Sequence, residues 1–286
     1  MPSVYKSPAA RRAIQSWCTQ ALARADFPLT TATVDTSAGQ VGLTSAGTEP
    51  VRVILVPGTG FSAAACLPWL RALSARWPTT VVDLPGQPGR SDPGRPRRGR
   101  PAWYGRVLDE VLAAMDADGV VVVGNSLGAA VALAAASPRI AARALISPAG
   151  FIRLSVGPRL ALASAAWLLR PTTGNTRRML RLFVSPGTEP PEPEVEWMAL
   201  MAAGCHPTLA PAALPAELLA RRAEQPCVVS VGQYDRFLPP RRLAPAVRRS
   251  MGLDVRILPG LGHLTTADRL GEVVSVVAAV ADPRGG

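Results

Sequence analysis

The sequence of 286 residues holds very little lysine and histidine and few aromatic side chains. Lys6 is the only lysine among 31 basic residues, so the net charge of +11 comes almost wholly from arginine. These arginines are scattered along the chain, apart from a run at Arg95, Arg97, Arg98 and Arg100. Scattered arginines are typical of a compositional bias rather than of a surface that binds an anionic polymer. We therefore expect a solvated basic surface, and neither a nucleic-acid nor a membrane partner.

The chain also lacks the features of a metal site and of a membrane span. Its four cysteines form no CxxC pair, and with only two histidines, His206 and His263, a metal cage is not expected. The longest apolar stretches, residues 160–169 and 273–281, are far shorter than the roughly 20 residues that cross a bilayer. No basic segment followed by an apolar one opens the chain, so no secretory signal is predicted. We expect a cytoplasmic protein that uses neither a metal nor an organic cofactor.

The apolar content, 48% of the residues, is sufficient for a large core. A helix is predicted over residues 8–25, where apolar side chains recur at helical spacing. Short runs rich in Val and Ile follow and alternate with helical segments. Because these runs are continuously apolar, they are typical of strands covered on both faces, and they predict an α/β fold with a mostly parallel sheet flanked by helices. The expected strands span residues 30–36, 41–45, 51–56, 79–82, 120–123, 144–146, 226–231 and 255–258, and a last helix spans 270–280.

The alternation stops between residues 151 and 222, where helical segments and proline-rich breaks occur without a strand-like run. An insertion of this length is typical of a lid over a binding site. We therefore expect a core formed by residues 1–150 and 223–286, with a helical cap over 151–222.

Two groups of side chains in this expected cap are considered as candidates for a functional role. Trp167 and Trp197, together with the methionines of the insertion, either line an apolar acyl pocket or form ordinary packing, which is the more frequent role of such residues. Glu192, Glu194 and Glu196 stand among prolines and are expected in a solvated loop.

The strongest chemical signal is the segment GNSLG at residues 124–128, which lies between a run of four valines and an alanine-rich helix. A strand-to-helix turn this tight has no room for side chains at its flanks, which explains Gly124 and Gly128. The serine between them is held in a strained conformation, with its hydroxyl at the C-terminal edge of the sheet. The N–H groups that begin the helix point at the same place, where an oxyanion would form. We predict that Ser126 is a nucleophile.

A serine hydroxyl needs a base, and the base needs a carboxylate that fixes its tautomer. His263 lies in a loop just after the last predicted strand, at the C-terminal edge of the sheet, whereas His206 lies in the insertion. Asp235 follows the strand over 226–231 in a loop at that same edge, whereas Asp254 begins a strand on the opposite side. The sequence therefore predicts a triad of Ser126, His263 and Asp235.

Four segments in this order resemble motifs of the α/β-hydrolase superfamily, over nearly the full length of the chain. GNSLG resembles its nucleophile elbow, GQYDRFLP its acid loop, PGLGH its histidine loop, and VVDLPGQPGRSD its D-x-P-G-x-G-x-S stretch. The opening VYKSPAARRAIQSW, with DLPGQPG, is similar to a serine carboxylesterase-like subgroup. Many relatives have His-Gly after the third strand, where this chain has Pro-Gly-Thr-Gly. The resemblance implies an oxyanion hole formed by the N–H groups of Thr59 and Leu127, with Gly60 as the alternative to Thr59.

The resemblance implies a serine hydrolase that cleaves carboxylic esters of small or medium hydrophobic molecules through an acyl-enzyme. The same triad also serves C–C bond hydrolysis, thioester release and lactone formation, and Asn125 before the nucleophile also occurs in C–C hydrolases. A ligand-binding relative without activity is a third possibility, which the complete triad disfavours. Weaker candidates for substrate contact are Gly60, Asn125, Trp167 and Trp197. The expected partner is a small ester or acyl substrate, and nothing in the sequence indicates an oligomeric state.

Overall fold

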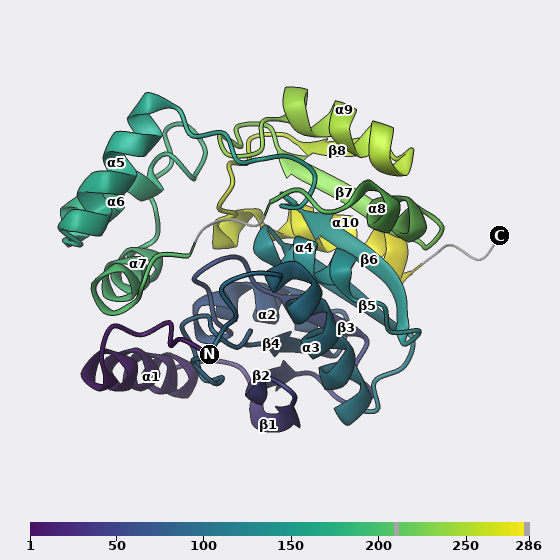
Figure 1. The fold of residues 1–286 in the computed structure, drawn as a ribbon, viewed down its shortest axis with the longest axis horizontal. Coiled ribbons are helices and arrows are strands. Elements are labelled where there is room, and N and C mark those ends of the chain that lie inside the picture. The colour runs from purple at the N-terminus through teal and green to yellow at the C-terminus, as the bar shows by residue number, and fades with distance from the viewer. Residues whose placement is uncertain (209–211, 283–286) are drawn as a thin grey trace.

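An eight-stranded sheet forms the centre of the computed structural model, which describes residues 1–208 and 212–282 (Figure 1). The strand order is β1-β2-β4-β3-β5-β6-β7-β8. Strand β2 runs antiparallel to both of its neighbours, β1 and β4. The remaining pairs, β4-β3, β3-β5, β5-β6, β6-β7 and β7-β8, are all parallel. The mostly parallel sheet expected from the sequence is confirmed. The strands are β1 Thr30–Thr36, β2 Gly39–Ala46, β3 Val53–Val56, β4 Thr79–Val82, β5 Val120–Asn125, β6 Ile140–Ile146, β7 Cys227–Gly232 and β8 Val255–Leu258.

Helices cover both faces of this sheet. In β3, Ile54 and Val56 pack in one apolar cluster with α3, α4, α8 and α9, whereas Val53 and Leu55 pack in a second cluster with α2 and α10. Successive residues of β3 thus enter apolar clusters on opposite faces of the sheet. This explains the continuous apolar runs in the sequence, which predicted strands buried on both faces. The helices named here are α2 Leu67–Ser74, α3 Arg100–Ala114, α4 Leu127–Ala134, α8 Ala216–Ala223, α9 Pro240–Met251 and α10 Leu270–Ala281.

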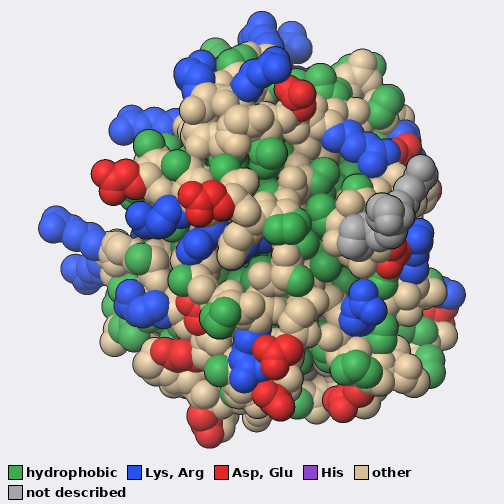
Figure 2. All heavy atoms as spheres, turned by 90° about the vertical axis from the view of Figure 1, so that its right-hand side faces the viewer, with side chains coloured by type: hydrophobic (Ala, Val, Ile, Leu, Met, Phe, Trp, Pro, Cys, Tyr) green, Lys and Arg blue, Asp and Glu red, His purple; other side chains and the backbone are tan. Residues whose placement is uncertain are grey.

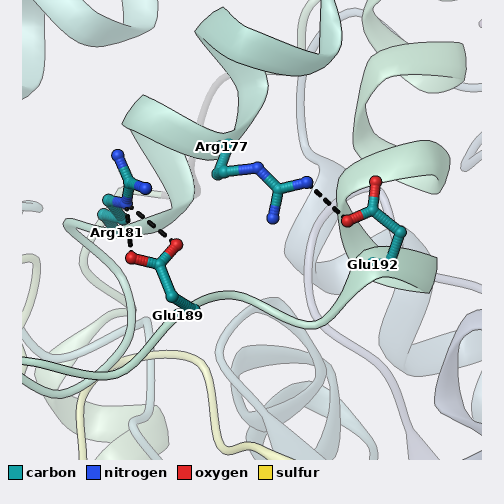
Figure 3. A network of polar contacts seen from close by, with 4 residues as sticks. All are labelled: Arg177, Arg181, Glu189 and Glu192. Atoms are coloured by element: carbon teal, nitrogen blue, oxygen red, sulfur yellow. Dashed lines mark hydrogen bonds and ion pairs between the residues drawn. The ribbon is translucent and has the colours of Figure 1, made fainter.

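Three further helices lie together at one end of the molecule, with the N-terminal helix α1 (Pro8–Ala23) beneath them (Figure 1). A third apolar cluster joins them to α1, and in it the rings of Trp17 and Trp197 lie 4.6 Å apart. Two ion pairs, Arg177–Glu192 and Arg181–Glu189, connect the second of these helices to the segment that begins the third (Figure 3). The three helices are α5 Pro158–Leu169, α6 Thr173–Leu180 and α7 Glu192–Gly204, and short 3₁₀ turns occur at Ala64–Cys66 and Ala267–Arg269.

Helix α8 falls inside the expected cap range but packs against α4 and α9 of the core. Its buried Leu219 belongs to the apolar cluster of those helices. We therefore propose a shorter cap that consists of α5, α6 and α7.

The first residues of the chain, which we call the N-terminal strap (residues 2–6), run between a core loop and the end of α7. Ser3 bridges Gly94, and Tyr5 bridges Cys205. Lys6, the single lysine, donates to the carbonyl oxygens of Ala202 and Ala203 at 2.8 and 3.1 Å. A cation at the C-terminal end of a helix satisfies carbonyl groups that have no partner within the helix. The strap therefore joins the cap to the core.

Arg95 was expected on a solvated surface, but the structure buries it next to this strap. Its guanidinium donates to the carbonyl oxygen of Gly86 at 3.0 Å, to the carbonyl of Pro207 and to the hydroxyl of Thr208. Burial lowers the pKa of Arg95. The side chain is buried because it holds the core loop to the segment that leaves α7, a contact between distant parts of the chain.

In the described part of the chain, no helix combines the length and the apolar character needed to cross a membrane.

Candidate active site

Ser126 stands at the turn from β5 into α4 with φ 51° and ψ −109°. This left-handed backbone is unusual for a residue with a side chain and marks stored strain at the turn. A Cβ on Gly124 would lie 2.6 Å from the backbone nitrogen of Ala129, and one on Gly128 would overlap the carbonyl oxygen of Val56. The two glycines are therefore required by the packing of the turn, as the sequence predicted.

His263 and Asp235 meet Ser126 at the C-terminal edge of the sheet, one from the loop after β8 and the other from the loop after β7. The Nε2 atom of His263 lies 3.2 Å from Oγ of Ser126, and Nδ1 lies 2.8 Å from Oδ2 of Asp235. The structure thus brings together the three side chains that the sequence selected. With a proton on Nδ1 donated to the carboxylate, Nε2 is the free acceptor that faces the serine hydroxyl.

The Asp235 carboxylate is fully buried and is held by several donors. Its Oδ1 accepts the backbone N–H groups of Phe237 and Leu238, each at 2.9 Å. Burial alone would raise the pKa of Asp235, but the charge and hydrogen bond of His263 and the backbone donors outweigh it. The pKa of this carboxyl therefore lies below its ordinary value, and the group is ionised at neutral pH.

Two aromatic rings shield the imidazole of His263. The ring of Phe237 lies 4.9 Å from it, and Phe183 meets Phe237 edge to face at 4.5 Å. Phe183 comes from the segment after α6, so the cap contributes to this shield. Low local polarity strengthens the hydrogen bond between His263 and Asp235.

Two backbone N–H groups near Ser126, those of Thr59 and Leu127, have no partner among the described residues. Leu127 begins α4, and Thr59 lies in the loop after β3. The alternative donor, the N–H of Gly60, is already bonded to Oε1 of Gln87 at 3.0 Å. This contact favours Thr59 over Gly60 as the second donor, and the pair remains a proposal.

Trp197 does not reach the cavity in front of Ser126. It is fully buried, and its indole N–H donates to the carbonyl oxygen of Gly60 at 2.7 Å. Gly60 is therefore held on both sides, by Trp197 at its carbonyl and by Gln87 at its N–H. Among the candidates for substrate contact, Trp197 is corrected to a side chain that positions the loop of Thr59.

A cavity of about 330 Å³ opens in front of Ser126 and His263. The other substrate candidates, Gly60, Asn125 and Trp167, all line it. Its walls are mostly apolar, and the cap supplies a large share of them. They include Pro57, Phe61, Trp69, Met179, Phe183, Met198, Met201, Phe237 and Leu264.

Two residues of this wall were not anticipated. Val4 of the N-terminal strap is fully buried there, although it lies far from the cap in the sequence. Glu194 was expected in a solvated loop, but it lies in the first turn of α7, half-buried, and faces the cavity. Burial raises the pKa of Glu194. No local sequence pattern signals either position, because each depends on the packing of α7 against the core.

Within residues 1–208 and 212–282, no three His, Cys, Asp or Glu side chains are grouped as a metal site would require. His206 also lines the cavity, and its backbone N–H donates to the carbonyl oxygen of Val4 at 2.8 Å. The imidazole that contacts the serine is that of His263.

Comparison with known proteins agrees with this fold. The model of the alpha/beta hydrolase family matches residues 53–276, well over half of the chain, and the chain belongs to this family. No curated protein sequence matches it.

Three similar crystal structures come from Bacillus subtilis. A putative hydrolase has a TM-score of 0.82 at 16% identity, covering 96% of this chain and 99% of its own. The carboxylesterase CesB has a TM-score of 0.78 at 17% identity, covering 95% and 98%. The naproxen esterase (carboxylesterase NP) also has a TM-score of 0.78 at 17% identity, covering 97% and 99%. At these identities the likeness establishes a shared fold.

Proposed function

We propose that this protein is a serine hydrolase that cleaves carboxylic esters of small or medium hydrophobic molecules. The observation that carries this proposal is the chain of contacts from Asp235 through His263 to Ser126, which ends in an apolar cavity. A cavity of about 330 Å³ with apolar walls suits a compact hydrophobic acyl or alcohol group. The esterases among the similar structures support the same choice of substrate class.

In the first half of the proposed reaction, His263 takes the proton of the Ser126 hydroxyl as the serine oxygen attacks the ester carbonyl carbon. The carbonyl oxygen becomes an oxyanion, which the N–H groups of Thr59 and Leu127 stabilise. Asp235 stabilises the imidazolium that forms. The tetrahedral intermediate then expels the alcohol, which takes the proton from His263, and the acyl group stays on Ser126.

In the second half, water replaces the alcohol and repeats the sequence. His263 removes a proton from water, the resulting hydroxide attacks the acyl carbon, and the acid leaves as Ser126 regains its proton. The positive φ of Ser126 keeps its hydroxyl at the edge of the sheet throughout, between the imidazole and the start of α4.

Covalent labelling tests the nucleophile directly. A fluorophosphonate probe is expected to label the wild-type protein at Ser126, as identified by peptide mass spectrometry. Ser126→Ala should remove the label, and His206→Ala should keep it. Labelling of another serine would reject the assignment.

A panel of chromogenic esters with acyl chains of increasing length tests the substrate class, together with a dienone substrate of C–C hydrolases. Fast ester turnover without dienone cleavage would support the proposal. Dienone cleavage in preference to ester turnover would replace it with C–C hydrolysis. Labelling without turnover of either substrate would favour a specialised thioester or lactone-forming reaction.

A further inference from the structure

The outer face of α5 carries an apolar stripe that no other part of the described protein covers. Residues 161, 162, 165, 168 and 169 lie on one side of the helix and are all Ala or Leu. Leu162 is 73% exposed, Leu169 is 82% exposed and Leu168 is 40% exposed. Exposed leucines at this spacing form a continuous patch, and a patch of this kind marks an interaction surface.

The patch continues past the start of α5. Val156, just before the helix, is 60% exposed. A groove beside it is lined by Pro158 of α5, together with Tyr234 and Ile257, which are 43% and 49% exposed. Apart from Met1, every strongly exposed large hydrophobic side chain of the described residues therefore belongs to α5, to the adjoining groove, or to Val156 two residues before α5. We call this surface the α5 patch.

Positive charge surrounds the α5 patch. From residue 151 to residue 188 the chain has six arginines and no acidic residue. Arg159 and Arg170 stand at the two ends of α5, and Arg236 and Arg241 line the adjoining groove. The only carboxylate in that lining is Asp235, which is fully buried and bonded to His263.

None of these four arginines forms an ion pair with a described residue. The charges elsewhere are arranged differently. Figure 2 shows the side of the molecule that faces away from α5, where basic and acidic side chains are interspersed. Unbalanced positive charge is thus a feature of the patch, as well as of the composition of the whole chain.

We propose that the α5 patch docks onto an anionic lipid surface. A short helix with an apolar stripe and flanking cations lies flat in the interface, with its leucines among the acyl chains and its arginines at the headgroups. This mode needs no membrane-spanning helix. It revises the expectation from the scattered arginines, because the fold gathers unpaired arginines around the exposed leucines. A second protein copy fits less well, because two such patches would bring like charges together.

Docking would also place the catalytic cavity at the lipid surface. Ser164, Trp167 and Leu168 of α5 line that cavity from its outer side. Leu168 therefore belongs both to the cavity wall and to the exposed stripe. This step rests on the proposed function: for an esterase docked in this way, amphiphilic esters in the lipid layer are the substrates nearest to Ser126.

Vesicle co-sedimentation tests this proposal without reference to activity. The probe is a set of vesicles made of equimolar phosphatidylglycerol and phosphatidylcholine, compared with vesicles of phosphatidylcholine alone. The wild-type protein, and Ser126→Ala equally, should sediment with the anionic vesicles at low salt and less at high salt. The double variant Leu162→Ser/Leu169→Ser should bind about tenfold more weakly or worse, because it removes the apolar anchors.

Two double charge reversals, one at the patch and one away from it as the matched control, test the role of the arginines. Arg159→Glu/Arg170→Glu should weaken binding by about tenfold or more, whereas Arg12→Glu/Arg106→Glu, which makes the same change in net charge on exposed positions of α1 and α3, should bind far better. Far-ultraviolet circular dichroism checks that each variant is folded.

Three results would overturn the proposal: no sedimentation of the wild-type protein with anionic vesicles, equal binding by the leucine variant, or equal loss in both arginine variants. A wild-type dimer in gel filtration that Leu162→Ser/Leu169→Ser converts to a monomer, without vesicle binding, would assign the patch to a second copy instead. Vesicle binding is measured without turnover and includes Ser126→Ala, so a failure of this test would leave the proposed ester hydrolysis untouched.

Discussion

At the scale of single residues, the role that we propose for Asp235 is exerted through the imidazole of His263. It accepts from Nδ1 at 2.8 Å and thereby directs the free acceptor Nε2 toward Ser126. In Asp235→Asn the amide can donate to Nδ1, which moves the imidazole proton to Nε2. A protonated Nε2 can no longer accept the proton of the serine hydroxyl. We expect kcat to fall on the order of 10⁴-fold with little change in KM. Steady-state ester hydrolysis measures this, and retention of most activity would move the acid elsewhere.

Glu194 gives a prediction about the pH dependence of stability, because its carboxyl group lies in a mostly apolar cavity wall. Burial raises its pKa in the folded protein, only partly opposed by a bond from its own backbone N–H. The unfolded chain therefore loses this proton at a lower pH than the folded protein. In the range between the two pKa values, the folded state binds more protons, and stability falls as the pH rises.

Glu194→Gln removes this penalty. The variant should be more resistant to urea than the wild type at pH 8, and the difference should shrink as the pH is lowered toward 4. Glu196→Gln, on the exposed side of the same helix, provides the control and should show no such pH-dependent gain. An equal effect of the two substitutions would mean that burial at 194 is not the cause.

At the scale of elements, helix α4, which follows Ser126, is held at its C-terminal end. Ser126 immediately precedes its first turn, and the carbonyl groups at its other end accept from two arginines. Arg143, fully buried in β6, donates to Ala132 and Ala135 at 2.8 and 3.1 Å, and Arg222 of α8 donates to Leu133 at 2.9 Å. Burial lowers the pKa of Arg143 to about 10, so it still carries its charge at neutral pH.

Removing this anchor should destabilise the whole core. Arg143→Met leaves the carbonyl groups of Ala132 and Ala135 buried without that donor, at a cost of about 2–3 kcal/mol in the free energy of unfolding. Arg139→Met removes only the surface pairs with Asp116 and Asp118 and should cost less than about 1 kcal/mol. Urea titration of both variants separates the two cases, and equal losses would show that the buried arginine is not an anchor.

The same arginine shows where sequence patterns fail. Strands β1, β4 and β8 have the bounds expected from their Val- and Thr-rich runs, but β6 begins at Ile140 rather than at residue 144. Arg143 breaks the apolar run, and only the packing of α4 provides the carbonyl groups that make its burial possible. Local patterns predict strands whose neighbours are apolar, and they miss the part of a strand that contains a buried polar group bonded to a distant helix.

At the scale of the whole molecule, the topology of the sheet explains why the candidate triad could be predicted. Parallel strands place all their C-terminal loops at one edge, so residues after β5, β7 and β8 converge even though they lie far apart in the sequence. No such rule governs the cavity walls. Val4 and Glu194 line the cavity through contacts between the strap, the cap and the core, which no periodicity encodes.

Substitution of Val4 tests whether the strap helps to form the cavity together with the cap and the core. Val4→Ala should enlarge the cavity and shift the preferred ester toward longer acyl chains, in addition to lowering stability by about 1–3 kcal/mol. Val41→Ala removes an equally buried side chain of β2 outside the cavity and should lower stability without changing that preference. The chain-length panel and urea titration report the two effects separately. An unchanged preference in Val4→Ala would show that the strap does not shape the substrate site.

The course of the strap also bears on how the protein is handled. An affinity tag joined ahead of Met1 would begin next to Gly94, three residues before Val4 of the cavity wall. The end of α10, at Ala281, lies at the right of Figure 1, away from the strap. Purification handles and fluorescent reporters fused at that end would be kept away from the cavity in front of Ser126.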